Sequence, residues 1–302
     1  MDLSAIIIEP GFFSNQPVQT ALVVSAITAV VSAVVGVFTV IRGQSFAGHA
    51  FSDIGGAGAS GAVLVGAQPL LGFVTLNVAA AGVMEMIGIR RARGRDLATG
   101  IVLGVALGFS ALFLFLATTY TSTSGATVSI LFGSLFTVAP SLIPVVAVLG
   151  AFVMALIAIL YRPLLLTSID YELAAVRGVP IRLVGIGYLI ALALAVSLSS
   201  ITIGAILSTA LLVGPPATAL RLTKRTGTAI AVASAVGVAA AWLGILISYD
   251  TASWSADGNG WPVSFCIVAV VFVFYVSASF PSRLGHRVRG HHQEPVKSLE
   301  PS

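Results

Sequence analysis

The sequence predicts an all-α, polytopic membrane protein: a bundle of about nine transmembrane helices. Hydrophobic residues make up 57% of the 302 residues and charged residues only 9%, whereas a soluble domain carries about 25% charged residues. The mean hydropathy is +1.04. The apolar residues form long runs, which cross a bilayer as helices because lipid offers the backbone no hydrogen-bond partners. The short alternating segments of a membrane β-barrel are absent from the sequence.

Nine apolar runs define the predicted spans. They cover residues 18–41, 50–71, 72–89, 97–119, 140–161, 183–200, 202–220, 228–249 and 262–280. A short turn near Gln68 and Pro69 joins the second run to the third. Residues 125–139 are too short to span alone, so we expect an external or re-entrant helix there and eight or nine spans in total.

The predicted membrane domain, residues 18–282, lies between two polar ends. Residues 1–17 form an extracytoplasmic N-terminal segment in this interpretation. Residues 283–302 are basic and contain histidine and proline without apolar periodicity. Such a segment cannot bury a core, so we expect a disordered cytoplasmic tail.

The distribution of Lys and Arg predicts the orientation in the membrane. These residues gather at alternate ends of the runs, near positions 42, 90–95, 162–182, 221–225 and 283–289. The loops 120–127 and 250–261 contain neither. Because short cytoplasmic loops collect Lys and Arg, we expect the N-terminus outside and the C-terminus inside the cytoplasmic membrane. The formal net charge of +4 then reflects topology, and no nucleic-acid partner is expected.

An imidazole and a carboxylate lie at the start of the second run. His49 and Asp53 are four residues apart, so they share a helix face, and together they suit a transition metal. Alternatively, Asp53 only orients His49, or both face water at the cytoplasmic mouth. Since ionisable groups inside a membrane protein are often functional, we predict that both are metal ligands. We interpret Glu85 as an interfacial side chain or a partner of Arg90.

Small residues recur every four positions along the second run, at Gly48, Ser52, Gly56 and Ser60. On a helix they form a smooth stripe that lets a neighbouring helix approach closely. We therefore predict helix packing beside the translocation path at this stripe.

A second feature of the path is expected in the run 202–220. There Gly214 precedes Pro215 and Pro216, which remove two backbone donors. We expect this span to be kinked or broken at Gly214. A broken helix at membrane depth is tolerated where it lines a cavity. The alternative is a kinked helix with a structural role only.

The loop between the fifth and sixth runs contains a short amphipathic helix. Ser168 or Asp170 can cap its start, and Gly178 followed by Pro180 ends it. A helix lying on lipid headgroups is the alternative, but Asp170 and Glu172 would be repelled by an anionic leaflet. We therefore predict a coupling element that docks on a cytoplasmic protein.

These stretches, in this order and spacing, resemble the permease family of ABC importers for zinc, manganese and iron ions, over about residues 23–280. The family's second span carries G-D-A-x-S-H-A-x-x-x-G, which is matched by Gly48, Ala50, Ser52 and Gly58. The family's Asp and His are exchanged here, as His49 and Asp53, which preserves one imidazole and one carboxylate four residues apart.

Two further patterns carry the resemblance. The family's coupling-helix pattern D-x-E-x-A-x-x-x-G is matched by Asp170, Glu172, Ala174 and Gly178. Its later pattern L-L-x-x-P-A-A-T-A is matched, with Pro216 in place of an alanine, by Leu211, Leu212, Pro215, Ala217, Thr218 and Ala219.

The resemblance implies a permease subunit that translocates a divalent transition-metal ion, zinc, manganese or iron, across the cytoplasmic membrane. It implies a homodimer, two separate cytoplasmic ATPase subunits and an extracytoplasmic metal-binding receptor. The sequence contains no G-x-x-x-x-G-K-[ST] loop, so ATP would be bound by the partner subunit. We expect no enzymatic activity of the chain itself and no covalently bound cofactor.

Two other functions stay open at this point. An ABC permease for a metal chelate or an organic cofactor would use His49 and Asp53 only as a structural pair. An autonomous metal channel or secondary transporter would have no use for a coupling helix.

Overall fold

The structure, a computed structural model, describes residues 12–87, 92–120, 129–133, 135–254 and 260–289. Within these ranges it contains helices and no strand, so the predicted all-α fold is confirmed. The helices are α2 (Gln16–Ile41), α3 (Ser45–Leu64), α4 (Pro69–Ile87), α5 (Ala92–Tyr120), α7 (Ile143–Ile169), α8 (Tyr171–Val176), α9 (Ile181–Ile203), α10 (Ser208–Leu222), α11 (Thr226–Trp254) and α12 (Val263–Arg289). Three short 3-10 turns are η1 (Phe12–Ser14), η2 (Leu135–Thr137) and η3 (Pro140–Leu142).

Each predicted run corresponds to one of the longer helices, in the same order. Six of these, α2, α4, α5, α7, α9 and α11, are long and apolar enough to cross a membrane by length and composition alone. The other three are α3, which is rich in Gly, Ala and Ser, α10, which has 15 residues, and α12, whose apolar part is Val263–Ser279. Within the described residues, the chain is therefore a polytopic helical bundle with six candidate spans and three further helices that match the predicted runs.

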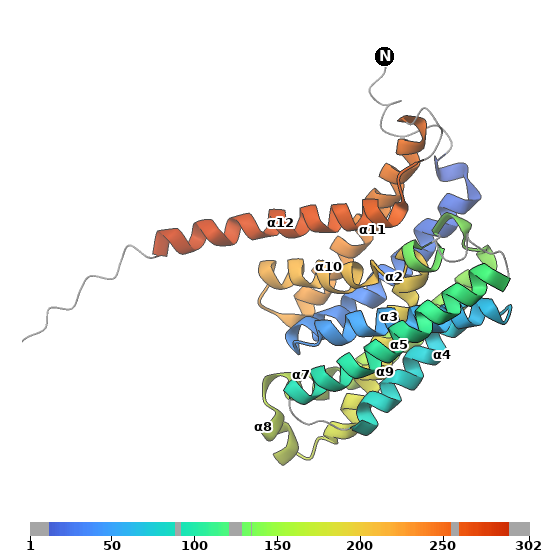
Figure 1. Cartoon of the computed structure of the whole chain (residues 1–302). Helices are drawn as coiled ribbons and strands as arrows, with labels where there is room; N and C mark the ends of the chain where they lie inside the picture. Colours follow the sequence, from blue (N-terminus) through green and yellow to red (C-terminus); the bar gives the residue numbers. More distant parts are fainter. Residues whose placement is uncertain (1–11, 88–91, 121–128, 134, 255–259, 290–302) are drawn as a thin grey trace, which may run out of the picture.

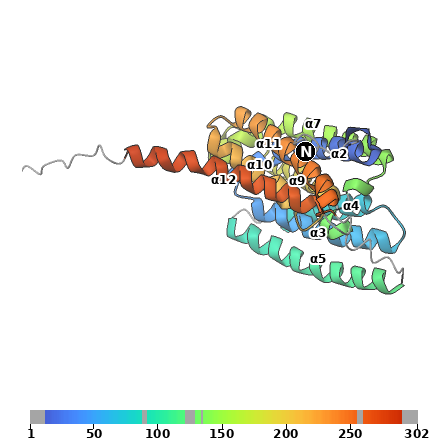
Figure 2. The same ribbon diagram turned by 90° about the horizontal axis from the view of Figure 1, so that it is seen from above.

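Helix α9 forms the centre of the bundle. It contacts α2, α3, α4, α7 and α10, and it buries Tyr188, Leu192 and Leu198 completely. Helix α5 packs mainly on α3 and lies at the edge of the bundle (Figure 2), while the C-terminal part of α12 extends away from the other helices (Figures 1 and 2). The predicted metal ligands His49 and Asp53 are on α3, one of the helices that contact α9.

The turn between α2 and α3 is short because α2 ends in a glycine cap. Gly43 has a φ of 63°, its N–H donates to the Val40 carbonyl at 3.1 Å, and the Gln44 N–H donates to the Thr39 carbonyl at 2.9 Å. This pair of bonds is the Schellman arrangement, which needs a left-handed residue. Arg42 precedes the glycine and α3 begins two residues after it.

The chain breaks between α9 and α10 at Gly204, whose φ of 84° and ψ of 162° suit glycine alone. There the Ala205 N–H donates to the Ile130 carbonyl at 3.0 Å and the Ile206 N–H to the Leu131 carbonyl at 3.2 Å. Residues 129–133 thus seal this break by backbone pairing. They belong to the segment expected to be external or re-entrant, whose residues 125–128 lie outside the described ranges.

The expected break at Gly214 is wrong, because α10 is helical from Ser208 to Leu222 and includes Pro215 and Pro216. Proline leaves earlier carbonyls without intrahelical donors. Here α2 approaches so closely at Gly36 that a Cβ there would overlap the Leu212 carbonyl oxygen and lie 2.7 Å from the Pro216 ring. Tertiary packing therefore holds the helix where local propensity favours an interruption.

The first residues of the tail that was expected to be disordered are helical in the structure. Helix α12 runs to Arg289, so residues 283–289 are helical, and residues 290–302 lie outside the described part. The absence of apolar periodicity excludes a buried core but not a helix, since Arg and Leu are good helix formers.

Candidate functional site

His49 and Asp53 lie side by side on α3. The His49 Nε2 is 3.6 Å from the Asp53 Oδ2, and the two side chains are 49% and 19% exposed. If one ion lay about 2.1 Å from both atoms, its two bonds would form an angle of about 120°, close to the tetrahedral value that zinc prefers. The spacing of the pair is therefore compatible with two ligands to one ion. Among the described residues, no three His, Cys, Asp or Glu side chains gather as a complete metal site.

The small-residue stripe presses α3 against α10. A Cβ on Gly48 would lie 2.6 Å from Leu212 Cδ2, and one on Gly56 would lie 3.4 Å from the Ala205 Cβ. The Ser52 hydroxyl hydrogen-bonds to the Ala205 carbonyl and to the Ser208 hydroxyl. These contacts join α3 to the first turn of α10 and to the break before it.

Helix α3 is buried at two residues of the small-residue stripe beyond the pair. Gly56 and Ser60, one and two turns further on, are buried, and the Ser60 hydroxyl donates to the Gly56 carbonyl of its own helix at 2.7 Å. His49 and Asp53 are therefore the last partly exposed polar side chains of α3.

The predicted coupling residues divide into three that build α8 and one that faces outward. Asp170 caps the helix, its Oδ1 accepting from the Leu173 N–H at 2.9 Å. Ala174 is fully buried. Gly178, with a φ of 74°, closes the C-terminus, where its own N–H donates to the Ala175 carbonyl at 3.0 Å. Glu172 is exposed.

Three apolar side chains around α8 were missed by the sequence interpretation. Ile169 and Val176 are 82% and 86% exposed, and Leu173 is 43% exposed. Leu173 and Val176 are three residues apart and so share one face of the helix. In a membrane protein, exposed apolar side chains contact either lipid or another protein. We call Ile169, Leu173 and Val176 the apolar surface of α8. Helix α8 lies at the end of the bundle opposite the start of α2 (Figure 1).

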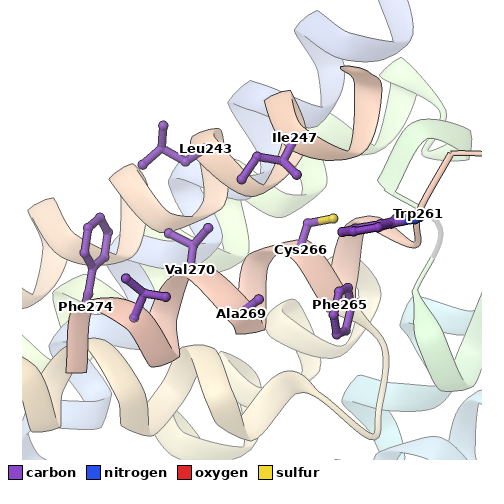
Figure 3. A pocket seen from close by; sticks show the side chains of 9 residues that line it. Leu243, Ile247, Trp261, Phe265, Cys266, Ala269, Val270 and Phe274 are labelled. Carbon is purple, nitrogen blue, oxygen red and sulfur yellow. The ribbon is translucent and has the colours of Figure 1, made fainter. Parts of the chain in front are cut away.

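Other candidate groups do not extend the site. Glu85, on α4, lies beside α9, its Oε2 3.5 Å from where a Cβ on Gly185 would stand, and Arg90 is outside the described residues. The thiol of Cys266 lines a groove of about 390 Å³ between α11 and α12, with Trp261 and Phe265 (Figure 3). Every lining residue of that groove is apolar, so it does not suit an ion.

Comparison with known proteins places the chain in a family. The model of the ABC 3 transport family matches residues 14–280. The manganese transport system membrane protein MntC of Listeria monocytogenes is 28% identical over 279 residues, covering 91% of this chain and 94% of that protein. MntC of Halalkalibacterium halodurans is 31% identical over 237 residues, covering 78% and 80%.

A solved structure agrees with the fold. PsaBC from Streptococcus pneumoniae in complex with Fab superposes with a TM-score of 0.77 at 26% identity, covering 92% of this chain and 95% of that one. Family match and fold extend over the same membrane region that carries His49, Asp53 and α8. The chain therefore belongs to the ABC 3 transport family and is a multi-pass membrane permease.

Proposed function

We propose that this chain is the permease subunit of an ABC importer for a divalent transition-metal ion, with manganese the first candidate. The observation that carries the proposal is the His49–Asp53 pair, whose partly exposed side chains lie 3.6 Å apart on α3. The relatives named as manganese transport or import proteins support the choice of metal. Oxygen ligands suit manganese, and imidazole also suits zinc and iron, so these two ions are the competitors to test.

The working unit in this proposal is a homodimer. One chain offers one nitrogen and one oxygen donor, whereas such metals take four to six ligands. A second copy would supply another His49 and Asp53, and water could complete the shell. Two ligands from each chain would also release the ion readily, as a transport site requires.

Two cytoplasmic ATPase subunits and an extracytoplasmic metal-binding receptor complete the proposed importer. The apolar surface of α8 and the exposed Glu172 are the docking element for the ATPase. Because α8 lies at the end opposite the start of α2 (Figure 1), ATPase docking there would place the start of α2 on the outer side. The basic ends of α2, α7 and α10, at Arg42, Arg162 and Arg221, agree with that orientation.

In the proposed mechanism, the receptor releases an ion to the outer mouth of the dimer. ATP binding and hydrolysis in the cytoplasmic subunits move α8, and this movement opens the path inward. His49 and Asp53 hold the ion during its passage. The permease itself performs no chemical step.

The test is ATP-dependent uptake of Mn²⁺, Zn²⁺ and Fe²⁺ into proteoliposomes that contain this chain, its ATPase and its receptor. We expect Mn²⁺ uptake by the wild type and its loss in His49→Ala and in Asp53→Ala, while the complex assembles and hydrolyses ATP. Glu85→Gln is the matched control, since it neutralises a carboxylate on a neighbouring helix, and it should transport normally. Uptake unchanged in both alanine variants would exclude the site, and no uptake of any of the three metals would exclude the function.

A further inference from the structure

Arg42 forms a polar junction at the end of the bundle where α8 lies. Its Nη1 donates to the Thr167 hydroxyl at 3.0 Å and lies 3.5 Å from the Ser168 hydroxyl. Its guanidinium also stacks over the Tyr188 ring, with 5.1 Å between Cζ and the ring centroid. One side chain thus connects α2 with the end of α7 and with the central helix α9.

Each partner of Arg42 is itself held in place. The Thr167 hydroxyl donates to the Pro163 carbonyl at 2.9 Å, and the Ser168 hydroxyl donates to the Leu164 carbonyl at 2.6 Å. Tyr188 is completely buried, and its hydroxyl donates to Thr39 of α2 at 2.9 Å. The junction therefore has little freedom, and a movement of one helix end passes to the others.

The residues of the junction lie next to the start of α8 on one side and next to the start of α3 on the other. Ser168 is two residues before Asp170, the cap of α8. On the other side, Arg42 precedes Gly43, and the tight glycine turn leads directly into α3, which carries His49 four residues after its first residue, Ser45. The junction thus connects the segment that leads into the docking helix with the turn that leads into the helix of the metal pair.

We infer that Arg42 is a positioning residue that transmits the movement of α8 to α3, and so couples ATP hydrolysis to ion passage. The inference rests on the proposed importer function. Arg42 does not touch the ion in this account. Its loss should therefore change the number of ions moved per ATP and leave the Mn²⁺ concentration for half-maximal uptake unchanged.

The test variant is Arg42→Lys, which keeps the charge but loses the planar fork that contacts two hydroxyls and an aromatic ring. The matched control is Arg221→Lys. Arg221 makes the same kind of junction between α10 and α12, donating to the Ser279 hydroxyl at 2.6 Å and to the Tyr275 hydroxyl at 2.5 Å, and stacking on Tyr275. Within the described residues, its side chain forms no hydrogen bond or ring contact with α7, α8 or α3, and its substitution should not affect coupling.

We expect Arg42→Lys to lower the Mn²⁺ transported per ATP by about two- to thirtyfold, the factor by which substitutions between two coupled sites change their coupling, whereas Arg221→Lys keeps the wild-type ratio. A variant with Thr167→Val and Ser168→Ala should lower the ratio similarly with the arginine intact. The combination with Arg42→Lys should add little, since the groups act as one unit.

The outcomes separate the two proposals. Absence of Mn²⁺ uptake by the wild-type complex would overturn the proposed function and this inference with it. Uptake by the wild type with an unchanged ratio in the Thr167/Ser168 variant, or an equal loss in Arg221→Lys, would overturn the inference alone.

Discussion

Replacing Gly204 by alanine should destabilise the protein strongly. Its backbone, with a φ of 84° and a ψ of 162°, lies in a region that only glycine occupies readily. A Cβ there would also stand 2.5 Å from the Gly133 backbone nitrogen and closer still to the Leu131 carbonyl oxygen. Because both neighbours are backbone atoms, the clash cannot be relieved by a side-chain rotation.

The size of the effect follows from two contributions. The backbone conformation costs a residue other than glycine about 1–3 kcal/mol. Moving residues 130–133 away breaks the two hydrogen bonds that Ala205 and Ile206 donate to this segment, each worth about 0.5–1.5 kcal/mol. The total loss in the free energy of unfolding is therefore about 2–6 kcal/mol.

The assay is thermal unfolding of the purified protein in detergent, followed with a thiol-reactive fluorescent dye. The chain has one cysteine, Cys266, which is only 2% exposed and becomes reactive on unfolding. Gly43→Ala is the control, because Gly43 has a φ of 63° but no atom within 4 Å of a Cβ. It should lose only about 1–2 kcal/mol. If Gly204→Ala unfolds at the same temperature as Gly43→Ala, residues 130–133 do not hold this break.

Two further predictions concern α8. Val176→Asp should leave the unfolding temperature unchanged, since Val176 is 86% exposed. It should weaken copurification with the ATPase at least about tenfold, because a charge is costly inside an apolar contact. Undiminished copurification would contradict docking through this surface. Asp170→Ala removes the bond to the Leu173 N–H and should cost α8 about 1 kcal/mol. The result would be hydrogen exchange about fivefold faster in residues 171–176, whereas Asp170→Asn, which keeps a capping oxygen, should exchange normally, and equal rates in the two variants would argue against the cap.

The fold was largely predictable because segments that span a bilayer are long apolar helices, which are visible in the sequence. The runs from 18–41 to 262–280 predict the helices in their observed order, and the turn at Gln68 and Pro69 lies between α3 and α4 as expected. The boundary between the runs 183–200 and 202–220 lies close to the observed break at Gly204, whereas the break expected at Gly214 was wrong. Pro215 and Pro216 are strong local signals, yet packing against Gly36 keeps them helical. The backbone pairing that seals the break at Gly204 was not predictable, because its partner segment is about 70 residues earlier in the chain.

The candidate site was predictable only where its residues are close in sequence. His49 and Asp53 are one helical turn apart, so a sequence pattern brings them together. Arg42 was assigned to topology alone, since its partners Thr167 and Ser168 are 125 and 126 residues away. The exposed Ile169 and Val176 were likewise missed, because an apolar residue near a span is expected to be buried in protein or lipid.

Exchange of the two ligands tests the central claim most directly. The variant His49→Asp with Asp53→His restores the order of the family pattern and keeps one imidazole and one carboxylate on the same face of α3. If the pair itself holds the ion, ATP-dependent Mn²⁺ uptake by this variant should persist, whereas His49→Ala and Asp53→Ala abolish it. An exchange variant that assembles and hydrolyses ATP but transports no better than the alanine variants would contradict the claim that these side chains act together as a metal site.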